Sequence, residues 1–251
     1  DHFTLRGWFD IYCTQGKSST PYFTYLEKKH RYFKIYETGW CKVDSFFNPK
    51  LPAEPHREKP TILYAPTFTK GISSAWEMTS VIEKLAKEKE WNWIITFHPK
   101  LDDAILRQQY IKLAEKYTNI DFRSVNKGLE TFRESDILLC DSSSLIVEYM
   151  MLDKPVVTFR NTHPGPFLLD VQTKDEVGLA IERALTHPNE LMQEIQKYTS
   201  YHESHRDGKN SARVLEAVDD FITYHQGHIK SKPLNIFRKL RLRWQLKYFK
   251  W

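Results

Sequence analysis

The sequence predicts an α/β fold, a doubly wound parallel sheet of the Rossmann type. Two observations support this prediction. From Thr61 onward, short runs of β-branched and aromatic residues alternate with stretches of helical periodicity, a spacing typical of βαβ units. The run Asp136–Cys140 is almost entirely apolar, as expected for a strand with helices on both faces of its sheet.

The predicted elements follow one another in a regular order. The predicted strands cover residues 61–65, 91–97, 120–122, 136–140 and 155–159. Capping boxes at Ser74–Glu77 and Thr173–Glu176 mark the starts of two helices, because a serine or threonine followed three residues later by glutamate bonds the first backbone N–H groups. Further helices are predicted around residues 105–117, 145–151, 189–198 and 211–224.

The first fifty residues repeat this pattern on a smaller scale. Strands are predicted at Phe9–Cys13 and Phe33–Glu37, with a helix between them, and the proline-rich segment Asn48–Pro60 indicates a linker. Fifty residues are too few for a sheet domain of their own. We therefore expect residues 1–56 to be the end of an N-terminal domain whose beginning is absent, residues 57–228 to form the second Rossmann-like domain, and residues 229–251 to form a tail.

Composition excludes several classes of protein. No apolar run approaches the roughly 20 residues that a membrane-spanning helix needs, so an integral membrane protein is not expected. The cysteines Cys13, Cys41 and Cys140 form no C-x-x-C pair, which argues against a disulfide framework and a zinc ribbon and favours a reducing compartment.

Charge is distributed unevenly along the chain. Residues 229–251 hold eight of the 37 Lys and Arg and no acidic residue, so the rest has 29 basic against 32 acidic groups. The body is therefore mildly acidic and the tail strongly basic. This asymmetry favours an anionic surface as a partner of the tail and argues against nucleic acid as a partner of the body.

Polar motifs follow several predicted strands. Asp141, Ser142, Ser143 and Ser144 lie where a buried strand passes into a helix, and the unpaired N–H groups and hydroxyls there can attract a phosphate. Helix capping is the alternative interpretation, and it explains one serine better than three. His98 follows another strand and can bond a phosphate or exchange a proton near neutral pH. Thr67 has the same position after the strand 61–65. The sequence has no dinucleotide or P-loop glycine fingerprint.

These motifs together resemble those of the bacterial CDP-glycerol glycerophosphotransferases, which make teichoic acid and capsule polymers. The resemblance covers nearly the whole body of the chain. It rests on the order of four motifs: Tyr64–Thr67, Phe97–Pro99, Asp141–Ser144 with Lys154–Val157, and Asp207–Lys209 with Arg213.

The resemblance implies a glycosyltransferase-B-type fold, of which this chain holds the C-terminal half. It implies transfer of glycerol phosphate from CDP-glycerol to an acceptor hydroxyl, on a lipid-linked or polysaccharide acceptor, with release of CMP. His98 and Ser142–Ser144 would hold the donor's phosphates, with Thr67, Asp141, Arg160 and Asp207 as further donor-binding candidates, and the base would lie in the N-terminal half. Thr69 and Lys70 stand where the family commonly has arginine, and Ser142 where it has an aromatic residue. No metal site is indicated, although Mg²⁺ is left open.

Other functions remain alternatives. The loop from Arg160 to Pro164 resembles that of UDP-N-acetylglucosamine 2-epimerases, so a nucleotide-sugar glycosyltransferase or epimerase is the second candidate. Aromatic and basic residues interleave in the tail, as an interfacial helix on anionic lipid requires, with Arg238, Arg241, Trp244, Lys247 and Trp251 as membrane contacts. The same helix could instead pack on the absent N-terminal half, or belong to a non-catalytic module that binds anionic surfaces. A peripheral protein at the inner face of the bacterial cell membrane is expected.

Overall fold

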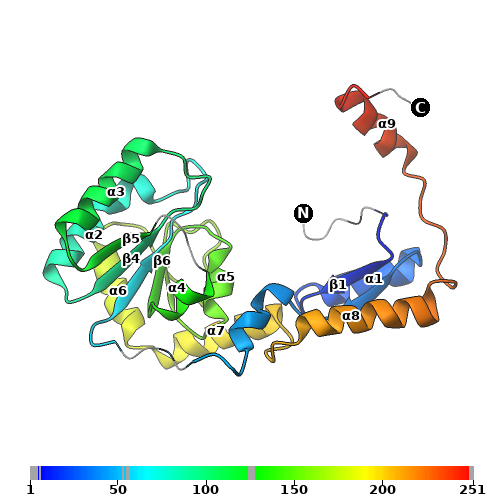
Figure 1. Cartoon of the computed structure of the whole chain (residues 1–251), viewed down its shortest axis with the longest axis horizontal. Helices are drawn as coiled ribbons and strands as arrows, with labels where there is room; N and C mark the ends of the chain where they lie inside the picture. Colours follow the sequence, from blue (N-terminus) through cyan, green and yellow to red (C-terminus); the bar gives the residue numbers. More distant parts are fainter. Residues whose placement is uncertain (1–4, 6, 53, 55–56, 124–127, 249–251) are drawn as a thin grey trace. The chain divides into compact units, whose positions relative to one another are not determined.

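The computed structural model describes residues 5, 7–52, 54, 57–123 and 128–248, and it divides the chain into two compact units (Figure 1). The larger one, here the sheet unit, comprises Ser45–Ser200. The other, here the terminal unit, combines Asp1–Asp44 with Tyr201–Trp251. No helix of the described residues is long and apolar enough to cross a bilayer.

The sheet unit contains a six-stranded parallel sheet in the order β5-β4-β3-β6-β7-β8, which confirms the predicted fold class. The strands are β3 (Thr61–Tyr64), β4 (Asn92–Thr96), β5 (Ile120–Arg123), β6 (Ile137–Cys140), β7 (Val156–Phe159) and β8 (Leu169–Val171). The chain runs outward from β3 to β5, returns to β6 beside β3, and then runs outward on the other side. The winding therefore reverses between β3 and β6, and ligands of open α/β sheets bind at such a switch point, beyond the carboxyl ends of the strands.

Helices cover both faces of this sheet (Figure 1). One face packs on α2 (Ala75–Glu88), α3 (Ala104–Lys116) and α6 (Glu176–Leu185), and the other on α4 (Leu129–Arg133), α5 (Leu145–Met150) and α7 (Asn189–His202). Successive side chains of a strand point to opposite faces, so Ile62 and Tyr64 join the first core cluster, and Leu63 joins the second. This double burial is the physical reason why the strands are apolar throughout.

Some local predictions differ from the structure. The strand β8 has three residues and α4 has five, too short to leave a periodic signal in the sequence. The capping box at Ser74 is not formed, because the Ser74 hydroxyl bonds the carboxylate of Asp141 instead. In the second box the Glu176 carboxylate does accept the backbone N–H of Thr173, at 2.9 Å.

The terminal unit contains the parallel pair β1 (Ile11–Thr14) and β2 (Lys34–Glu37) with α1 (Thr20–His30) between them in sequence. The remaining elements are the 3-10 helix η1 (Cys41–Phe47), α8 (Asn210–Asp220), the π-helix η2 (Phe221–His225) and α9 (Ile236–Gln245). A single helix had been expected where α8 and η2 follow each other.

Residues 201–228 thus lie with the N-terminal segment and not, as the sequence suggested, with the larger domain. Two long-range contacts explain this difference. The carboxylate of Asp44 accepts the backbone N–H groups of Asn210 and Ser211, at 2.9 and 2.7 Å, where α8 begins. Near the end of α8, the Tyr36 hydroxyl donates to Asp220 at 2.6 Å. Both ends of α8 are therefore bonded to residues of the N-terminal segment.

Candidate functional site

Four predicted site positions meet at the carboxyl edge of the sheet, which we call the rim. Thr67 follows β3, His98 follows β4, the segment Asp141–Ser144 follows β6, and Arg160 follows β7. These four strands are neighbours in the order β4-β3-β6-β7, so their end loops are adjacent across the switch point. Asp207 belongs to the terminal unit.

Asp141 bonds the loops of β3 and β6 together. Its side chain is fully buried; one carboxylate oxygen accepts the N–H of Thr67 at 2.8 Å, and the other accepts the N–H and the hydroxyl of Ser74 at 2.8 and 3.0 Å. Burial raises the pKa of this carboxyl above its ordinary value, against the lowering effect of these hydrogen bonds. A direct phosphate contact does not fit this arrangement. Asp141 instead positions the loop that carries Thr67, whose own side chain is largely buried.

The three serines retain donors for an anion. The Ser142 hydroxyl oxygen accepts the N–H of Thr162 at 2.8 Å, and that of Ser143 accepts the N–H of Leu145 at 3.2 Å. A hydroxyl that accepts can still donate its own proton. Ser144 is exposed at the start of α5 and makes no capping bond with its side chain. Because α5 has only six residues, the hydroxyls matter more for anion binding than the helix dipole.

His98 is exposed, and the structure fixes which nitrogen of its ring can donate. Its Nδ1 accepts the backbone N–H of Lys100 at 3.0 Å, so the neutral imidazole carries its proton on Nε2. The ring lies against Phe68, with centroids 4.4 Å apart, and the Lys100 ammonium is 5.3 Å from the centroid of the Phe68 ring. This end of the rim therefore offers an N–H donor, a cation and an aromatic surface.

Arg160 has partners within the chain. One guanidinium nitrogen donates to Glu77 at 3.0 Å and another to the Gln172 carbonyl at 3.0 Å, and the group lies 4.4 Å from the Phe159 ring centroid. Its charge is therefore partly neutralised by Glu77. A donor contact by Arg160 stays a prediction, and an anion there would compete with this ion pair.

Asp207 also has a partner within the chain. Its carboxylate forms a bidentate ion pair with Arg213, at 2.9 and 2.6 Å, which holds the pKa of Asp207 far below its ordinary value. A second anion beside this carboxylate would be repelled. This ion pair orders the loop before α8, and a donor contact by Asp207 stays a prediction.

Lys154 of the Lys154–Val157 motif is also structural. It is buried, and its ammonium donates to the carbonyls of Phe132 and Ser135 at 3.1 and 2.8 Å, at the end of α4, and pairs with Glu54 at 2.9 Å. The carbonyls that end a helix lack intrahelical partners, so this cation satisfies them.

Sequence reasoning gave no site role to Phe68, and it noted Ser74 only as a helix cap and the loop with Asn161, Thr162 and His163 only for its resemblance to epimerases. Asn161 donates from its side chain to the Asp141 carbonyl at 2.8 Å, which connects the loops of β6 and β7. For Phe68 and the residues 161–163 the available signal was position, since they follow predicted strands as closely as the residues that were chosen.

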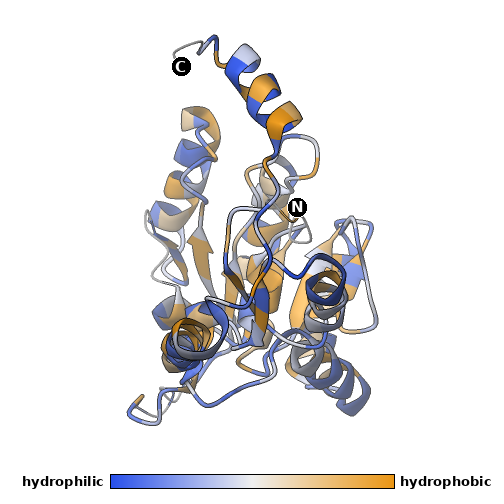
Figure 2. Ribbon diagram, turned by 90° about the vertical axis from the view of Figure 1, so that its right-hand side faces the viewer, coloured by the Kyte–Doolittle hydropathy of each residue, from blue (hydrophilic) through white to orange (hydrophobic). Residues whose placement is uncertain are grey.

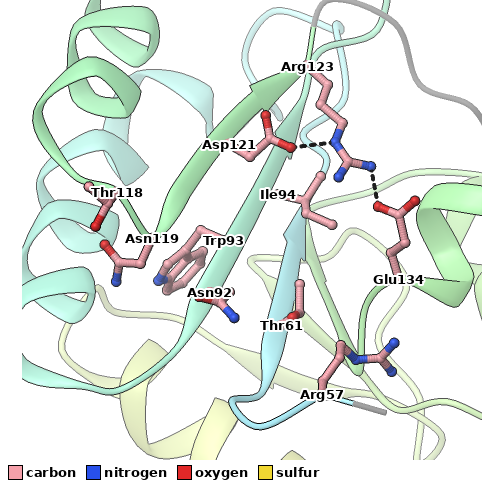
Figure 3. Close-up of a pocket in the computed structure, with 10 residues that line it drawn as sticks. All are labelled: Arg57, Thr61, Asn92, Trp93, Ile94, Thr118, Asn119, Asp121, Arg123 and Glu134. Atoms are coloured by element: carbon pink, nitrogen blue, oxygen red, sulfur yellow. Dashed lines mark hydrogen bonds and ion pairs between the residues drawn. The ribbon is translucent and has the colours of Figure 1, made fainter. Parts of the chain in front are cut away.

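A cavity of about 320 Å³ lies away from the rim (Figure 3). Thr61 and Asn92 line it, and these residues begin β3 and β4, so it opens near the amino ends of the strands. Arg123 is already paired there with Asp121 and Glu134, at 2.7 and 2.6 Å. The described residues contain no group of three or more His, Cys, Asp or Glu that could hold a metal ion.

A six-stranded parallel sheet with helices on both faces and a switch point between β3 and β6 defines the class of this protein, an α/β domain of the Rossmann type. The family follows from a sequence model, described as CDP-glycerol:poly(glycerophosphate) glycerophosphotransferase, which matches residues 25–220. This match covers more than half of the chain, and the chain belongs to that family.

Curated relatives are proteins of teichoic acid synthesis. A teichoic acid poly(ribitol-phosphate) polymerase of Bacillus spizizenii is 28% identical over 185 residues, 64% of this chain and 28% of the relative. A teichoic acid ribitol-phosphate primase of the same organism is 24% identical over 207 residues, 70% of this chain and 48% of the relative. The chain thus spans half or less of the length of these relatives.

Solved structures support the fold. A UDP-N-acetylglucosamine 2-epimerase superposes with a TM-score of 0.60 at 19% identity, over 89% of this chain and 60% of the other. The wall teichoic acid polymerase TagF, soaked with CDPG, superposes with a TM-score of 0.57 at 19% identity, over 90% of this chain and 60% of the other. Similarity at this identity shows a shared architecture and does not separate transferase from epimerase.

Proposed function

We propose that the rim binds a CDP-linked polyol such as CDP-glycerol, and that the protein transfers the polyol phosphate to an acceptor hydroxyl with release of CMP. The observation that supports this most is the position of His98 and the serines on either side of the switch point, in a chain that belongs to the glycerophosphotransferase family.

The chemistry suits these groups. Transfer of a phosphoryl-containing group needs positioned donors for the charge that develops on the phosphate oxygens, more than covalent help from the protein. His98 supplies an Nε2 proton, and Ser142 and Ser143 supply hydroxyl protons. Because its Nδ1 already accepts a hydrogen bond, neutral His98 is a donor and not the base. The resemblance assigns the base to a histidine of an N-terminal half.

The acceptor is proposed to be a lipid-linked or polysaccharide chain of a cell-envelope polymer, either teichoic acid or capsule. The nucleotide product separates this proposal from an epimerase, because an epimerase isomerises its UDP-sugar and releases no CMP.

Binding and turnover together test the proposal. CDP affinity of the whole chain is measured by calorimetry, and CMP release from CDP-glycerol is followed in the presence of an acceptor. His98→Ala should weaken CDP binding at least about tenfold, since it removes a hydrogen bond to a charged group, and should abolish turnover. His187→Asn is the matched control, because His187 is an exposed histidine beside Pro60 and Asp136 at the opposite edge of the sheet. A His98→Ala protein with unchanged affinity and turnover would refute the role of His98.

We further propose that α9 binds an anionic membrane surface. At 3.6 residues per turn, Ile236, Phe237, Leu240 and Trp244 fall within about 100° of the helix circumference. All four are exposed, Phe237 at 90% and Trp244 at 79%, and basic residues alternate with them around the helix (Figure 2). Arg238 lies 5.9 Å from the Trp8 ring centroid, so the side of the helix away from the apolar face contacts the chain itself.

The structure shortens the predicted tail helix. It ends at Gln245, so Lys247 lies just beyond it, and Trp251 is outside the described residues. Apolar side chains for insertion and cations for lipid head groups remain present in α9, with Arg241 next to the apolar face. Peripheral binding at the inner face of the bacterial cell membrane is the location that we propose. Flotation with anionic liposomes, compared between the whole chain and a chain truncated at Pro233, tests it, and equal binding of the two would contradict it.

A further inference from the structure

The loop after β7, Asn161–His163, is a part of the rim that the proposed function does not use. Asn161 and Thr162 bond the neighbouring loop and β8. The Asn161 backbone N–H donates to Asp170 at 2.8 Å and its side chain to the Asp141 carbonyl at 2.8 Å. The Thr162 N–H donates to Ser142 at 2.8 Å. This loop is therefore fixed beside the serines that the proposed function assigns to the donor.

His163 is presented by this fixed loop. Its backbone N–H donates to the Asn161 side chain at 2.8 Å, its own side chain is exposed, and its Nδ1 lies 3.0 Å from the Thr162 hydroxyl oxygen. Within the described residues this is the one hydrogen bond of the ring, so Nε2 is left for a ligand. Arg160, just before the loop, adopts φ = +53°, a conformation that side chains other than glycine rarely take and that recurs at ligand sites.

His163 and His98 stand at opposite ends of the site. Three strand spacings of about 4.8 Å separate β4 from β7, so the two loops are roughly 14 Å apart. One phosphate is much narrower than this distance and does not contact both imidazoles. An extended nucleotide with an attached polyol is long enough to do so.

The two ends also differ in chemistry. The loop of β3 exposes Phe68 and Ile72, and Phe68 lies against His98, so this end suits the flat face of a nucleobase. The loop of β7 presents an amide, a hydroxyl and an imidazole beside Ser142. Such donors and acceptors match the several hydroxyls of a polyol.

We propose that His163 and Thr162 bind the polyol of the donor and help to select it. This inference rests on the proposed function, because it takes the ligand to be a CDP-polyol. Nε2 of His163 hydrogen-bonds a polyol hydroxyl, while Thr162 holds the other ring nitrogen and thereby sets the orientation of the imidazole.

A comparison of the affinities for CDP and for CDP-polyols distinguishes a contact to the polyol from a contact to the nucleotide. Calorimetry on the whole chain measures the affinities for CDP, CDP-glycerol and CDP-ribitol in the wild type, His163→Ala, Thr162→Val and the control His187→Asn. His163→Ala should keep CDP affinity within about twofold and lose about five- to tenfold in affinity for at least one CDP-polyol, the effect of one hydrogen bond. Thr162→Val should lower the affinity for the same CDP-polyol, and His187→Asn should leave the affinities for all three ligands unchanged.

Two results for His163→Ala would overturn the inference, and one result for the wild type would refute the proposed function. Equal weakening of CDP and CDP-polyols in His163→Ala would overturn the inference, because the contact would then be to the nucleotide. Unchanged affinity for all three ligands would overturn it as well. Wild-type protein that binds none of the three would refute the proposed function itself. Far-UV circular dichroism and thermal unfolding confirm that each variant is folded, and His163→Phe, whose ring has no nitrogen to bond a hydroxyl, repeats the test if the alanine variant is not.

Discussion

The carboxylate of Asp141, at the end of β6, accepts the backbone N–H of Thr67, in the loop after β3, at 2.8 Å. This bond crosses the switch point of the sheet, where the ligand of a doubly wound fold is expected. The other oxygen accepts two bonds from Ser74. One buried side chain therefore orders the loop from Thr67 to Ser74, and with it Phe68, against which His98 lies.

Asp141→Asn should destabilise the protein by about 2–3 kcal/mol, because the amide nitrogen of asparagine cannot accept a hydrogen bond and would face an N–H donor. The free energy of unfolding in urea measures this effect. The loop of Phe68 should also lose its order, so CDP affinity should fall together with stability.

Asp121→Asn is a suitable comparison, since Asp121 is an exposed aspartate whose ion pair with Arg123 lies on the edge strand. Exposed pairs contribute about 0–1 kcal/mol. If the two variants were equally stable, the ordering role of Asp141 would be wrong.

The positions of the strand ends could be predicted, because each βαβ unit leaves a local pattern in the sequence. The sequence alone therefore placed Thr67, His98 and Ser142 at the carboxyl edge of the sheet. The partner of each side chain could not be predicted in this way. Ser74 has the spacing of a capping box, but a carboxylate 67 residues further along competes for its hydroxyl and wins. Arg160 looked free for phosphate, and its partner Glu77 lies 83 residues earlier.

The division into units was missed for a related reason. Residues 201–228 carry the same helical periodicity as the helices before them, and periodicity does not say which sheet a helix packs on. Asp44, which bonds the first N–H groups of α8, is 166 residues from Asn210. Such pairings depend on the three-dimensional arrangement and leave no trace in spacing.

Gly39→Ala should destabilise the terminal unit by about 3 kcal/mol or more. Gly39 has φ = +83°, and a Cβ there would overlap the side chains of Asn210 and Glu203. Overlap with packed side chains adds to the backbone strain. Chemical denaturation, followed by tryptophan fluorescence and circular dichroism, measures the loss.

Gly71→Ala separates the two contributions. Gly71 has a similar φ of +91°, but a Cβ there meets no atom of the described residues within 4 Å. Only the backbone cost of about 1 kcal/mol is expected. Equal losses in the two variants would show that crowding at Gly39 is not what matters.

Stability should fall at alkaline pH because of buried tyrosines. Burial raises the pKa of Tyr110 to about 12, and its hydroxyl donates to the Ala75 carbonyl at 2.8 Å. An unfolded tyrosine ionises near pH 10. The stabilisation is therefore complete below pH 10 and is lost as pH rises toward 12, by about 1.4 kcal/mol per pH unit for this group. Unfolding free energies at pH 8 to 11 measure the slope.

Tyr110→Phe should reduce that slope, although it lowers stability at pH 8 by leaving the Ala75 carbonyl without its donor. Tyr25→Phe serves as the control, because Tyr25 is exposed. Tyr25→Phe should leave the slope of unfolding free energy against pH unchanged. A Tyr110→Phe protein with the wild-type slope would contradict the assignment to Tyr110.

The face of α9 gives the last prediction. Replacing both Phe237 and Trp244 by alanine removes both aromatic side chains of α9, which are exposed. It should weaken binding to anionic liposomes by at least tenfold, since each side chain would bury apolar area in the interface. Arg241→Glu should weaken binding by a similar factor at low salt and by less at 0.5 M NaCl, because screening removes the electrostatic part. Flotation at two salt concentrations measures both. Leu215→Ala, at an exposed leucine of α8, is the control. If the double aromatic variant bound as the control does, then insertion of α9 would be excluded, and charge alone would have to account for any binding.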